Sequence, residues 1–185
     1  GVAVGRFRGR PAVIVLLNAA MGIPPVVAGL IVYLLLSRAG PLGSLGILFT
    51  PTAMVIAQVL LITPIVAALS RQVIEDAWCE YEEQLTSLGV TRARAALTIL
   101  WDTRFSLATV GLAGLGRAMA EVGAVMIVGG NIDGVTRVMT TAIALETTKG
   151  DLPLALALGV ILLTVVLLLN LAAHFVREWS VRNYG

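Results

Sequence analysis

The sequence has one cysteine and one histidine, and these scarcities exclude several kinds of site. With Cys79 alone, the chain can form neither an internal disulfide nor a cysteine-based metal site. With His174 alone, it has no histidine cluster for metal binding or acid–base catalysis. Charged residues make up only 13% of the 185 residues, whereas apolar residues make up 58% and the mean hydropathy is +0.94. This composition is typical of a membrane protein, and we expect it to bind no metal.

Four stretches are apolar enough to cross a bilayer, which takes about 20 helical residues. They cover residues 12–36, 51–70, 103–128 and 152–176. Pro24 and Pro25 in the first stretch remove two amide donors, so they must break or kink that helix. The freed carbonyls then need partners from neighbouring helices or a water-lined path. Pro51 suits a helix start. Gln58 is predicted either to hydrogen-bond to a neighbouring helix or to line a path.

The third stretch contains an ionisable pair. Arg117 and Glu121 are four residues apart, so one helical turn brings them together. Ionisable groups at this depth are costly, and they indicate either a functional site or an internally paired structural bridge. Gly116, Ala120 and Ala124 also recur every four residues, which predicts a flat ridge for close helix packing.

Residues 72–102 form a polar segment between the second and third stretches, and they hold six of the chain's 11 acidic residues. The spacing predicts a helix with one apolar face, which includes Leu88, and with acids near its start, where the helix dipole favours them. Gly89 is predicted to end this helix in the left-handed conformation, and Thr91 to cap a second one. The first helix lacks the basic residues that DNA binding requires. A simple interpretation is an amphipathic connector on the membrane surface.

Residues 129–151 are too short and too polar to cross a membrane. Apolar positions from Val138 to Leu145 predict a short amphipathic helix, closed by Lys149 and Gly150. After the last stretch, the segment from His174 to Tyr184 is predicted to be an interfacial tail with aromatic anchors.

The distribution of basic residues predicts the orientation. With four crossings, both ends of the chain and residues 72–102 lie on one side. That side carries nine basic residues: Arg6, Arg8, Arg10, Arg71, Arg92, Arg94, Arg104, Arg177 and Arg182. The other side carries three: Arg38, Arg137 and Lys149. Because basic residues gather on the cytoplasmic side, the first set is predicted to be cytoplasmic.

Two motifs resemble permease subunits of bacterial ABC importers. Glu83, Gly89 and Ile99 have the spacing of the EAA loop, although Gln84 and Leu85 replace its two alanines and Trp101-Asp102 replaces its Leu-Pro. The run from Gly116 to Ile132, GRAMAEVGAVMIVGGNI, resembles tungstate and molybdate permeases, and residues 17–33, 136–143 and 149–151 extend the likeness towards the tungstate branch.

The resemblance implies an all-α membrane protein with the type I ABC importer permease fold, similar to the molybdate and methionine permeases. Residues 1–185 would form a single permease domain of four transmembrane helices, and the family's first helix would precede Gly1. Residues 72–102 would be the cytoplasmic coupling loop and residues 129–151 the outer loop. The chain would not be an enzyme and would bind no cofactor of its own; ATP and magnesium would bind to a partner ATPase.

The implied function is ATP-driven import of tungstate, or of molybdate, across a prokaryotic cell membrane. The implied partners are a second permease copy, two cytoplasmic ATPase subunits, an extracytoplasmic oxyanion-binding protein and the lipid bilayer, without nucleic acid. Import of sulfate or another anion is an alternative. An ion-coupled secondary carrier that uses Arg117 and Glu121 and a membrane scaffold are two further alternatives. The sequence does not distinguish among the three oxyanions.

Three groups of site residues follow from these arguments. The residues expected to couple the chain to the ATPase are Glu83, Gly89, Thr91 and Ile99. The residues expected to line the path or to pack its helices are Pro24, Pro25, Gln58, Arg117, Glu121 and Asn131. The residues expected to dock the binding protein, or to offer donors to an oxyanion, are Thr136, Arg137, Thr140 and Thr141.

Overall fold

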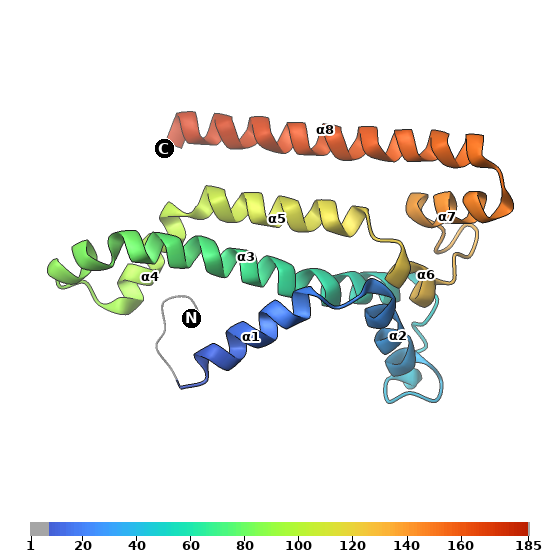
Figure 1. Cartoon of the computed structure of the whole chain (residues 1–185), viewed down its shortest axis with the longest axis horizontal. Coiled ribbons are helices and arrows are strands. Elements are labelled where there is room, and N and C mark those ends of the chain that lie inside the picture. Colours follow the sequence, from blue (N-terminus) through green and yellow to red (C-terminus); the bar gives the residue numbers. More distant parts are fainter. Residues whose placement is uncertain (1–7, 185) are drawn as a thin grey trace. The chain divides into compact units, whose positions relative to one another are not determined.

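The computed structural model describes residues 8–184, and the regular structure of this part is helical (Figure 1). In chain order the elements are α1 (Arg10–Met21), α2 (Pro25–Leu36), the 3-10 turn η1 (Gly43–Leu45), α3 (Pro51–Ser87), α4 (Arg92–Asp102), α5 (Arg104–Met119), α6 (Gly123–Gly129), α7 (Met139–Lys149) and α8 (Leu152–Tyr184). Arg6, which was used for the predicted orientation, lies outside the described residues. The side chains of four residues of the predicted orientation and tail also lie outside the described part: Arg177, Trp179, Arg182 and Tyr184.

Two helices of the described chain are each long and apolar enough to cross a membrane: α3, and residues Leu152–Ala172 of α8. Two further spans are available if each of two bent pairs, α1 with α2 and α5 with α6, counts as one crossing. The predicted all-helical membrane architecture is therefore confirmed, with two to four candidate spans.

The interruption between α1 and α2 lies where the prolines predict it. Helix α1 ends at Met21, Pro24 is the extended N-cap of α2 with ψ of 134°, and Pro25 is the first helical residue. Proline fits that first position because its amide would have no helical partner there. The predicted break is confirmed.

Helix α3 differs from the sequence prediction in its length. It begins at Pro51 as expected, but it continues past residue 70 to Ser87, a total of 37 residues, with Pro64 inside it. The second span and the acidic helix are therefore one helix, about 55 Å long at 1.5 Å per residue. The acidic residues lie in its C-terminal half and none lies in its first turn. The proposed stabilisation of these acids by the helix N-terminus is wrong, because the helix begins much earlier.

The helices divide into two compact units. One unit includes α1, the part of α3 from Pro64 onward, α4 and α5 as far as Gly114. The other comprises residues Ile23–Thr63 and Leu115–Val176, and it includes α2, the start of α3, α6, α7 and most of α8. Helices α3, α5 and α8 each continue from one unit into the other.

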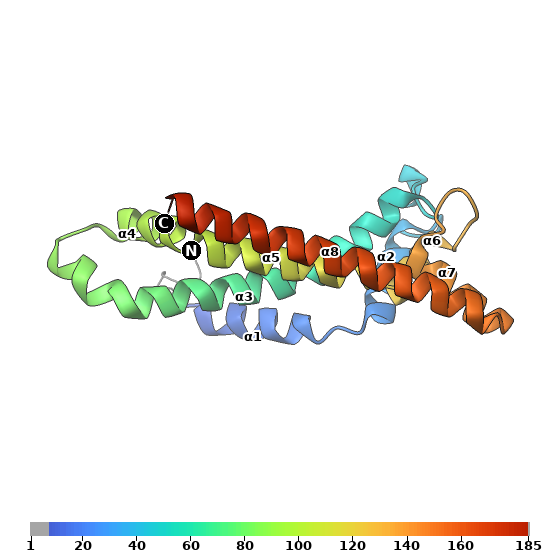
Figure 2. The same ribbon diagram turned by 90° about the horizontal axis from the view of Figure 1, so that it is seen from above.

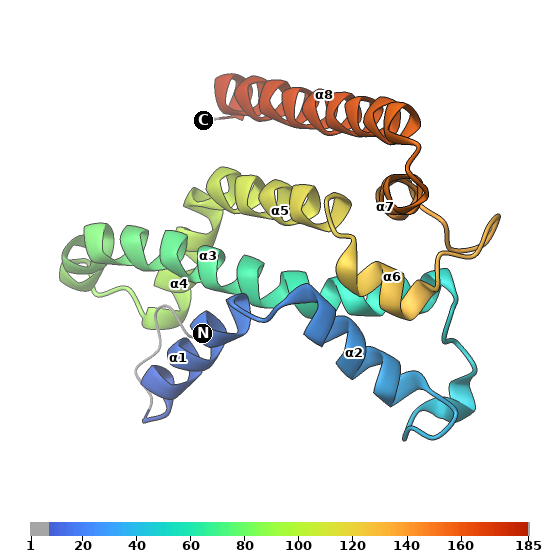
Figure 3. The same cartoon turned by 45° about the vertical axis from the view of Figure 1, so that its right-hand side comes forward.

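The second unit has a hydrophobic core built from α2, α3 and α6. Its buried members are Val32, Leu36, Ala53, Met54, Ala57, Ala124, Val125 and Val128. Helices α2 and α6 lie side by side (Figure 3). A Cβ on Gly29 of α2 would lie 2.7 Å from the Cα of Ala124 in α6, so only glycine permits this approach.

The predicted ridge of small residues on the third span is wrong. Helix α5 ends at Met119 and α6 begins at Gly123, so Gly116, Ala120 and Ala124 do not share one helix. Ala124 packs on α2, whereas a Cβ on Gly116 would have no neighbour within 4 Å.

Candidate functional site: a polar helix break and the turn after α3

Glu121 is the central residue of the break between α5 and α6. Its side chain is 5% exposed, and its Oε2 lies 3.1 Å from Nη1 of Arg117, so the predicted pairing of these two residues is confirmed. The other carboxylate oxygen, Oε1, accepts a hydrogen bond of 3.3 Å from the backbone N–H of Ala124. The carboxylate thus satisfies one of the amide donors left free at the start of α6.

Two neighbouring helices complete the polar contacts of the break. Nε2 of Gln58 in α3 donates to the carbonyl of Ala118, at 3.1 Å. Oγ1 of Thr140 in α7 donates to the carbonyl of Glu121, also at 3.1 Å. Gln58 therefore bonds to a neighbouring helix, which is one of its two predicted roles. The carbonyl of Ala118 also accepts from the N–H of Glu121, at 3.2 Å, so Gln58 supplies a second hydrogen bond there. Three side chains, from Gln58, Glu121 and Thr140, thus bond to backbone groups at the break.

A cavity of about 350 Å³ lies beside the break. Its polar lining comes from Gln58, Glu121 and Thr140, and its apolar lining includes Met54 and Met119. Arg117 is not among the lining residues, and its side chain is 43% exposed. The ion pair is therefore asymmetric: the carboxylate is buried and the guanidinium is half exposed.

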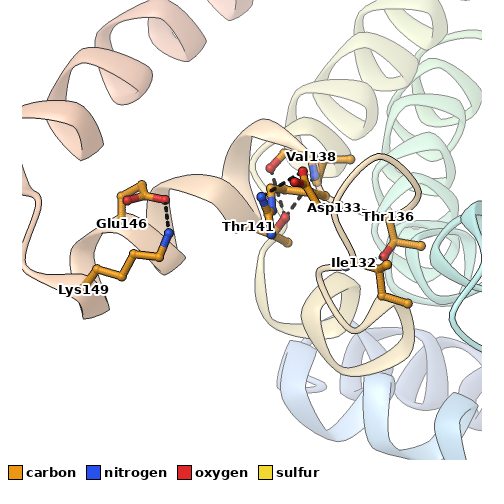
Figure 4. A network of polar contacts seen from close by, with 8 residues as sticks. Ile132, Asp133, Thr136, Val138, Thr141, Glu146 and Lys149 are labelled. Carbon is orange, nitrogen blue, oxygen red and sulfur yellow. Dashed lines mark hydrogen bonds and ion pairs between the residues drawn. The ribbon is translucent and has the colours of Figure 1, made fainter.

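The segment between α6 and α7, which is seen from above in Figure 2, is held from inside by threonines. Oγ1 of Thr136 donates to the carbonyl of Gly129 at 2.6 Å and accepts from the N–H of Ile132 at 2.9 Å. Thr141 accepts from the N–H of Val138, at 3.0 Å (Figure 4). Thr136 and Thr141 are 2% and 0% exposed.

The other predicted residues of this segment are placed differently. Thr140 is buried against Glu121, as described above. Arg137 is partly exposed and pairs with Asp133 at 2.9 Å. Asn131 has a φ of 49°, and its Oδ1 is buried without a hydrogen-bond partner in the described structure. The hydroxyls of all three threonines are thus used within the chain, and Arg137 is the docking candidate that reaches the surface.

The turn after α3 follows the sequence prediction in its backbone. Gly89 has a φ of +68°, and the N–H of Val90 closes the helix end on the carbonyl of Leu85, at 3.1 Å. Thr91 is the N-cap residue of α4, with ψ of 146°, but its side chain makes no capping hydrogen bond. Ile99 is 1% exposed, so it anchors α4.

Exposed apolar side chains lie in this turn and on α4. Leu88, Leu97 and Trp101 are 76%, 68% and 71% exposed, and Glu83 is also exposed. The prediction that Leu88 belongs to the apolar face of this helix is wrong, because α3 ends at Ser87 and Leu88 lies in the turn after it. Sequence reasoning did not single out these three residues, because the sequence does not show which apolar side chains the fold leaves exposed.

A carboxylate with two arginine partners links α1 to α3 in the same unit. Oε1 of Glu75 lies 2.5 Å from Nη2 of Arg10, and Oε2 pairs with Arg71. Arg71 and Glu75 are four residues apart, which is a spacing that sequence can predict. The contact with Arg10 bridges 65 positions and could not be predicted.

Known proteins resemble this chain over nearly its whole length, although no protein-family model matches it. A probable anion ABC transporter permease of Haloferax volcanii is 41% identical over 183 residues, covering 96% of this chain and 79% of that protein. The tungstate uptake system permease TupB of Peptoclostridium acidaminophilum is 39% identical over 175 residues, covering 95% and 77%. The sulfate transport permease CysT of Escherichia coli is 29% identical over 171 residues, covering 89% and 62%. As the motifs of residues 83–99 and 116–132 predict, the chain belongs to the permease subunits of ABC transporters.

Proposed function

We propose that this chain is the membrane-spanning subunit of an ATP-driven importer of a tetrahedral oxyanion, tungstate or molybdate. Support comes from the sequence identities, which are higher with tungstate permeases than with sulfate permeases. Two tungstate uptake permeases are 39% and 40% identical to the chain, whereas sulfate transport permeases are 26% to 32% identical. As an ABC permease the chain is a non-catalytic transport subunit.

The proposal includes the fold and the assembly. The chain adopts the type I importer fold, as a multi-pass protein of a prokaryotic membrane with both ends cytoplasmic. Two copies line one path, two ATPase subunits bind ATP and magnesium in the cytoplasm, and an outer binding protein delivers the oxyanion. The predicted excess of basic residues on one side supports this orientation.

The observation that carries the coupling role is the exposed surface around Gly89. Leu88 in the turn and Leu97 and Trp101 on α4 are exposed apolar side chains, and Glu83 near the end of α3 is also exposed. Exposed apolar side chains on a segment predicted to face the cytoplasm suit contact with a partner. We assign these side chains to the contact with the ATPase. Ile99 and Thr91 act indirectly, because Ile99 anchors α4 and Thr91 starts it.

The break around Glu121 is the proposed moving part of the path. Gln58 belongs to α3, the same helix that ends at the coupling turn, so a displacement of that turn acts on the contact between Gln58 and Ala118. ATP-driven closure of the ATPase pair would then bias the path between its inward-open and outward-open states. An ion-coupled secondary carrier would use Arg117 and Glu121 but would need no exposed cytoplasmic turn.

The test is ATP-dependent uptake of tungstate into proteoliposomes that contain the permease, its ATPase and its binding protein, with sulfate as competitor. A Gly89→Val variant is expected to reach the membrane but to lose ATPase co-purification and tungstate uptake. A Cβ at positive φ costs about 1 kcal/mol or more, and it would have no neighbour within 4 Å at Gly89, so the effect acts through the turn.

Gly134→Val is the matched control. Gly134 has a φ of +69°, also has open space around its Cβ position, and lies in the segment between α6 and α7. It therefore imposes the same backbone strain away from the coupling turn. Equal loss of ATPase binding in both variants, or normal coupling in Gly89→Val, would refute the coupling role.

A further inference from the structure

A second cavity lies in the turn between α2 and α3. Its volume is about 530 Å³, and its lining includes Tyr33 and Ser37 together with Arg38, Leu48 and Phe49. All of its lining residues belong to one compact unit. The distribution of basic residues predicts that this turn, with Arg38, lies on the outer side of the membrane.

Arg38 gives this cavity an uncompensated positive charge. Three basic residues are predicted on the outer side, and two of them are neutralised within the chain. Arg137 pairs with Asp133 at 2.9 Å, and Lys149 pairs with Glu146 at 2.7 Å (Figure 4 shows the second pair). Within residues 8–184 no carboxylate pairs with Arg38, and no acidic residue lines the cavity.

One wall of the cavity is strained and held in place. Phe49 has a φ of +63°, which is rare for a residue with a side chain. Its N–H donates to the carbonyl of Val128 in α6, at 3.0 Å. Its ring meets Tyr33 edge-on, with 6.1 Å between ring centroids, and it would lie 2.9 Å from a Cβ on Gly130. Strained residues persist where their surroundings fix them, and they gather at functional sites. The cavity is therefore preformed.

We propose that this cavity is an oxyanion site, where the imported anion first contacts the permease on the outer side. The inference rests on the proposed function. The planar guanidinium of Arg38 matches two oxygens of a tetrahedral anion, and the hydroxyl groups of Tyr33 and Ser37 are available donors. Ser37 now donates to the carbonyl of Leu34, at 3.1 Å, so it exchanges that bond when the anion enters.

A site with a single positively charged side chain, Arg38, is expected to bind the oxyanion weakly enough to release it into the path. Transport requires binding that is favourable enough for entry and weak enough for exit. The volume leaves room for an anion with part of its hydration shell, since one water occupies about 30 Å³ in the liquid. An uncompensated charge in a concave wall also attracts anions from solution, which raises their local concentration.

The first experiment measures binding directly. The purified complex of permease and ATPase, without binding protein, is dialysed to equilibrium against tungstate, and bound tungsten is measured. Arg38→Gln is expected to weaken tungstate binding by about 10-fold or more, because a charge-assisted hydrogen bond is lost. Lys149→Gln removes the same charge from a neutralised pair and is expected to bind as the wild type does. Equal binding by the wild type and Arg38→Gln would overturn the site.

The second experiment separates the anion from the binding protein as the partner of Arg38. In the reconstituted transporter, Arg38→Gln is expected to lower the maximal uptake rate without changing the half-saturating concentration of loaded binding protein. If that concentration rises instead, and empty binding protein loses its stimulation of ATP hydrolysis, Arg38 contacts a carboxylate of the binding protein and the oxyanion site is wrong.

The wild type distinguishes this inference from the proposed function. A wild-type complex that takes up no tungstate refutes the function itself. Wild-type uptake together with an unaffected Arg38→Gln refutes the site alone. Thermal unfolding of the purified variant checks folding, which we expect to be unchanged because Arg38 is exposed.

Discussion

The chain interrupts two of its helical segments in different ways. Between α1 and α2, Pro24 and Pro25 remove the amide donors, and no side chain caps the new helix. Between α5 and α6 there is no proline, and the break depends on side chains of Gln58, Glu121 and Thr140. The first break is imposed by covalent structure and survives any rearrangement of its neighbours. The second is held by hydrogen bonds from α3 and α7, so a movement of either helix would act on it.

The largest predicted effect comes from breaking the ion pair at the second break. Arg117→Gln leaves the buried carboxylate of Glu121 without its counter-ion, which is expected to cost about 3 kcal/mol of stability. Glu121→Gln leaves a guanidinium that is already half exposed, so it should cost less. The double variant should be milder than Arg117→Gln. Thermal unfolding of the purified permease measures all three.

The relative stabilities of these three variants decide whether Arg117 and Glu121 form a structural ion pair. A double variant as unstable as Arg117→Gln would mean that both side chains matter separately. A double variant that folds well and transports nothing would instead indicate that the charges act on the oxyanion.

A smaller effect is expected where α6 meets α2, just after the second break. Gly29→Ala places a methyl group 2.7 Å from the backbone of Ala124, and such overpacking typically costs about 1–3 kcal/mol. Gly116→Ala is the matched control, because its methyl group has open space in this chain. The same unfolding assay compares them. Equal losses would contradict the close approach of α2 and α6.

Removing the hydrogen bond between Thr140 and Glu121 should lower the stability by a smaller amount than Gly29→Ala does. Thr140→Val deprives the carbonyl of Glu121 of its donor, at about 1 kcal/mol. Thr148→Val on the same helix removes an exposed hydroxyl that bonds three residues back, to the carbonyl of Leu145. It is expected to leave both stability and uptake unchanged. If the two variants behave alike, α7 does not hold the break.

The smallest effect is expected at the first break. Pro25→Ala restores a donor at the first position of α2, where no partner is required, and Pro24 still interrupts the helix. The cost should be about 0.5 kcal/mol, through the greater freedom of the unfolded chain. A loss as large as that of Arg117→Gln would show that the two breaks do not differ as described. Unfolding and uptake both check this.

The sequence predicts those features that single residues impose locally. Pro24 and Pro51 mark helix starts or breaks, Gly89 and Gly150 adopt the left-handed conformation, and the four-residue spacing brings Arg117 to Glu121. Each follows from backbone geometry, without knowledge of neighbours.

Features that depend on tertiary contacts could not be predicted. The spacing of Gly116, Ala120 and Ala124 suggested a continuous helix, but the break is stabilised by Gln58 and Thr140, which lie far away in sequence. Helix α3 runs through the junction between its apolar and acidic halves because no proline or glycine interrupts it there. A change of polarity alone does not end a helix.

The continuity of α3 after Pro64 also fixes an angular relation along the chain. Positions 68 and 75 are seven residues apart on one helix, which is about two turns at 3.6 residues per turn. The buried Ala68 and the ion-paired Glu75 therefore point in nearly the same direction. One inserted residue would rotate the two by about 100° relative to each other, whereas seven inserted residues would nearly restore their alignment. An insertion that a loop would tolerate would therefore turn either Ala68 away from its packing or Glu75 away from Arg10.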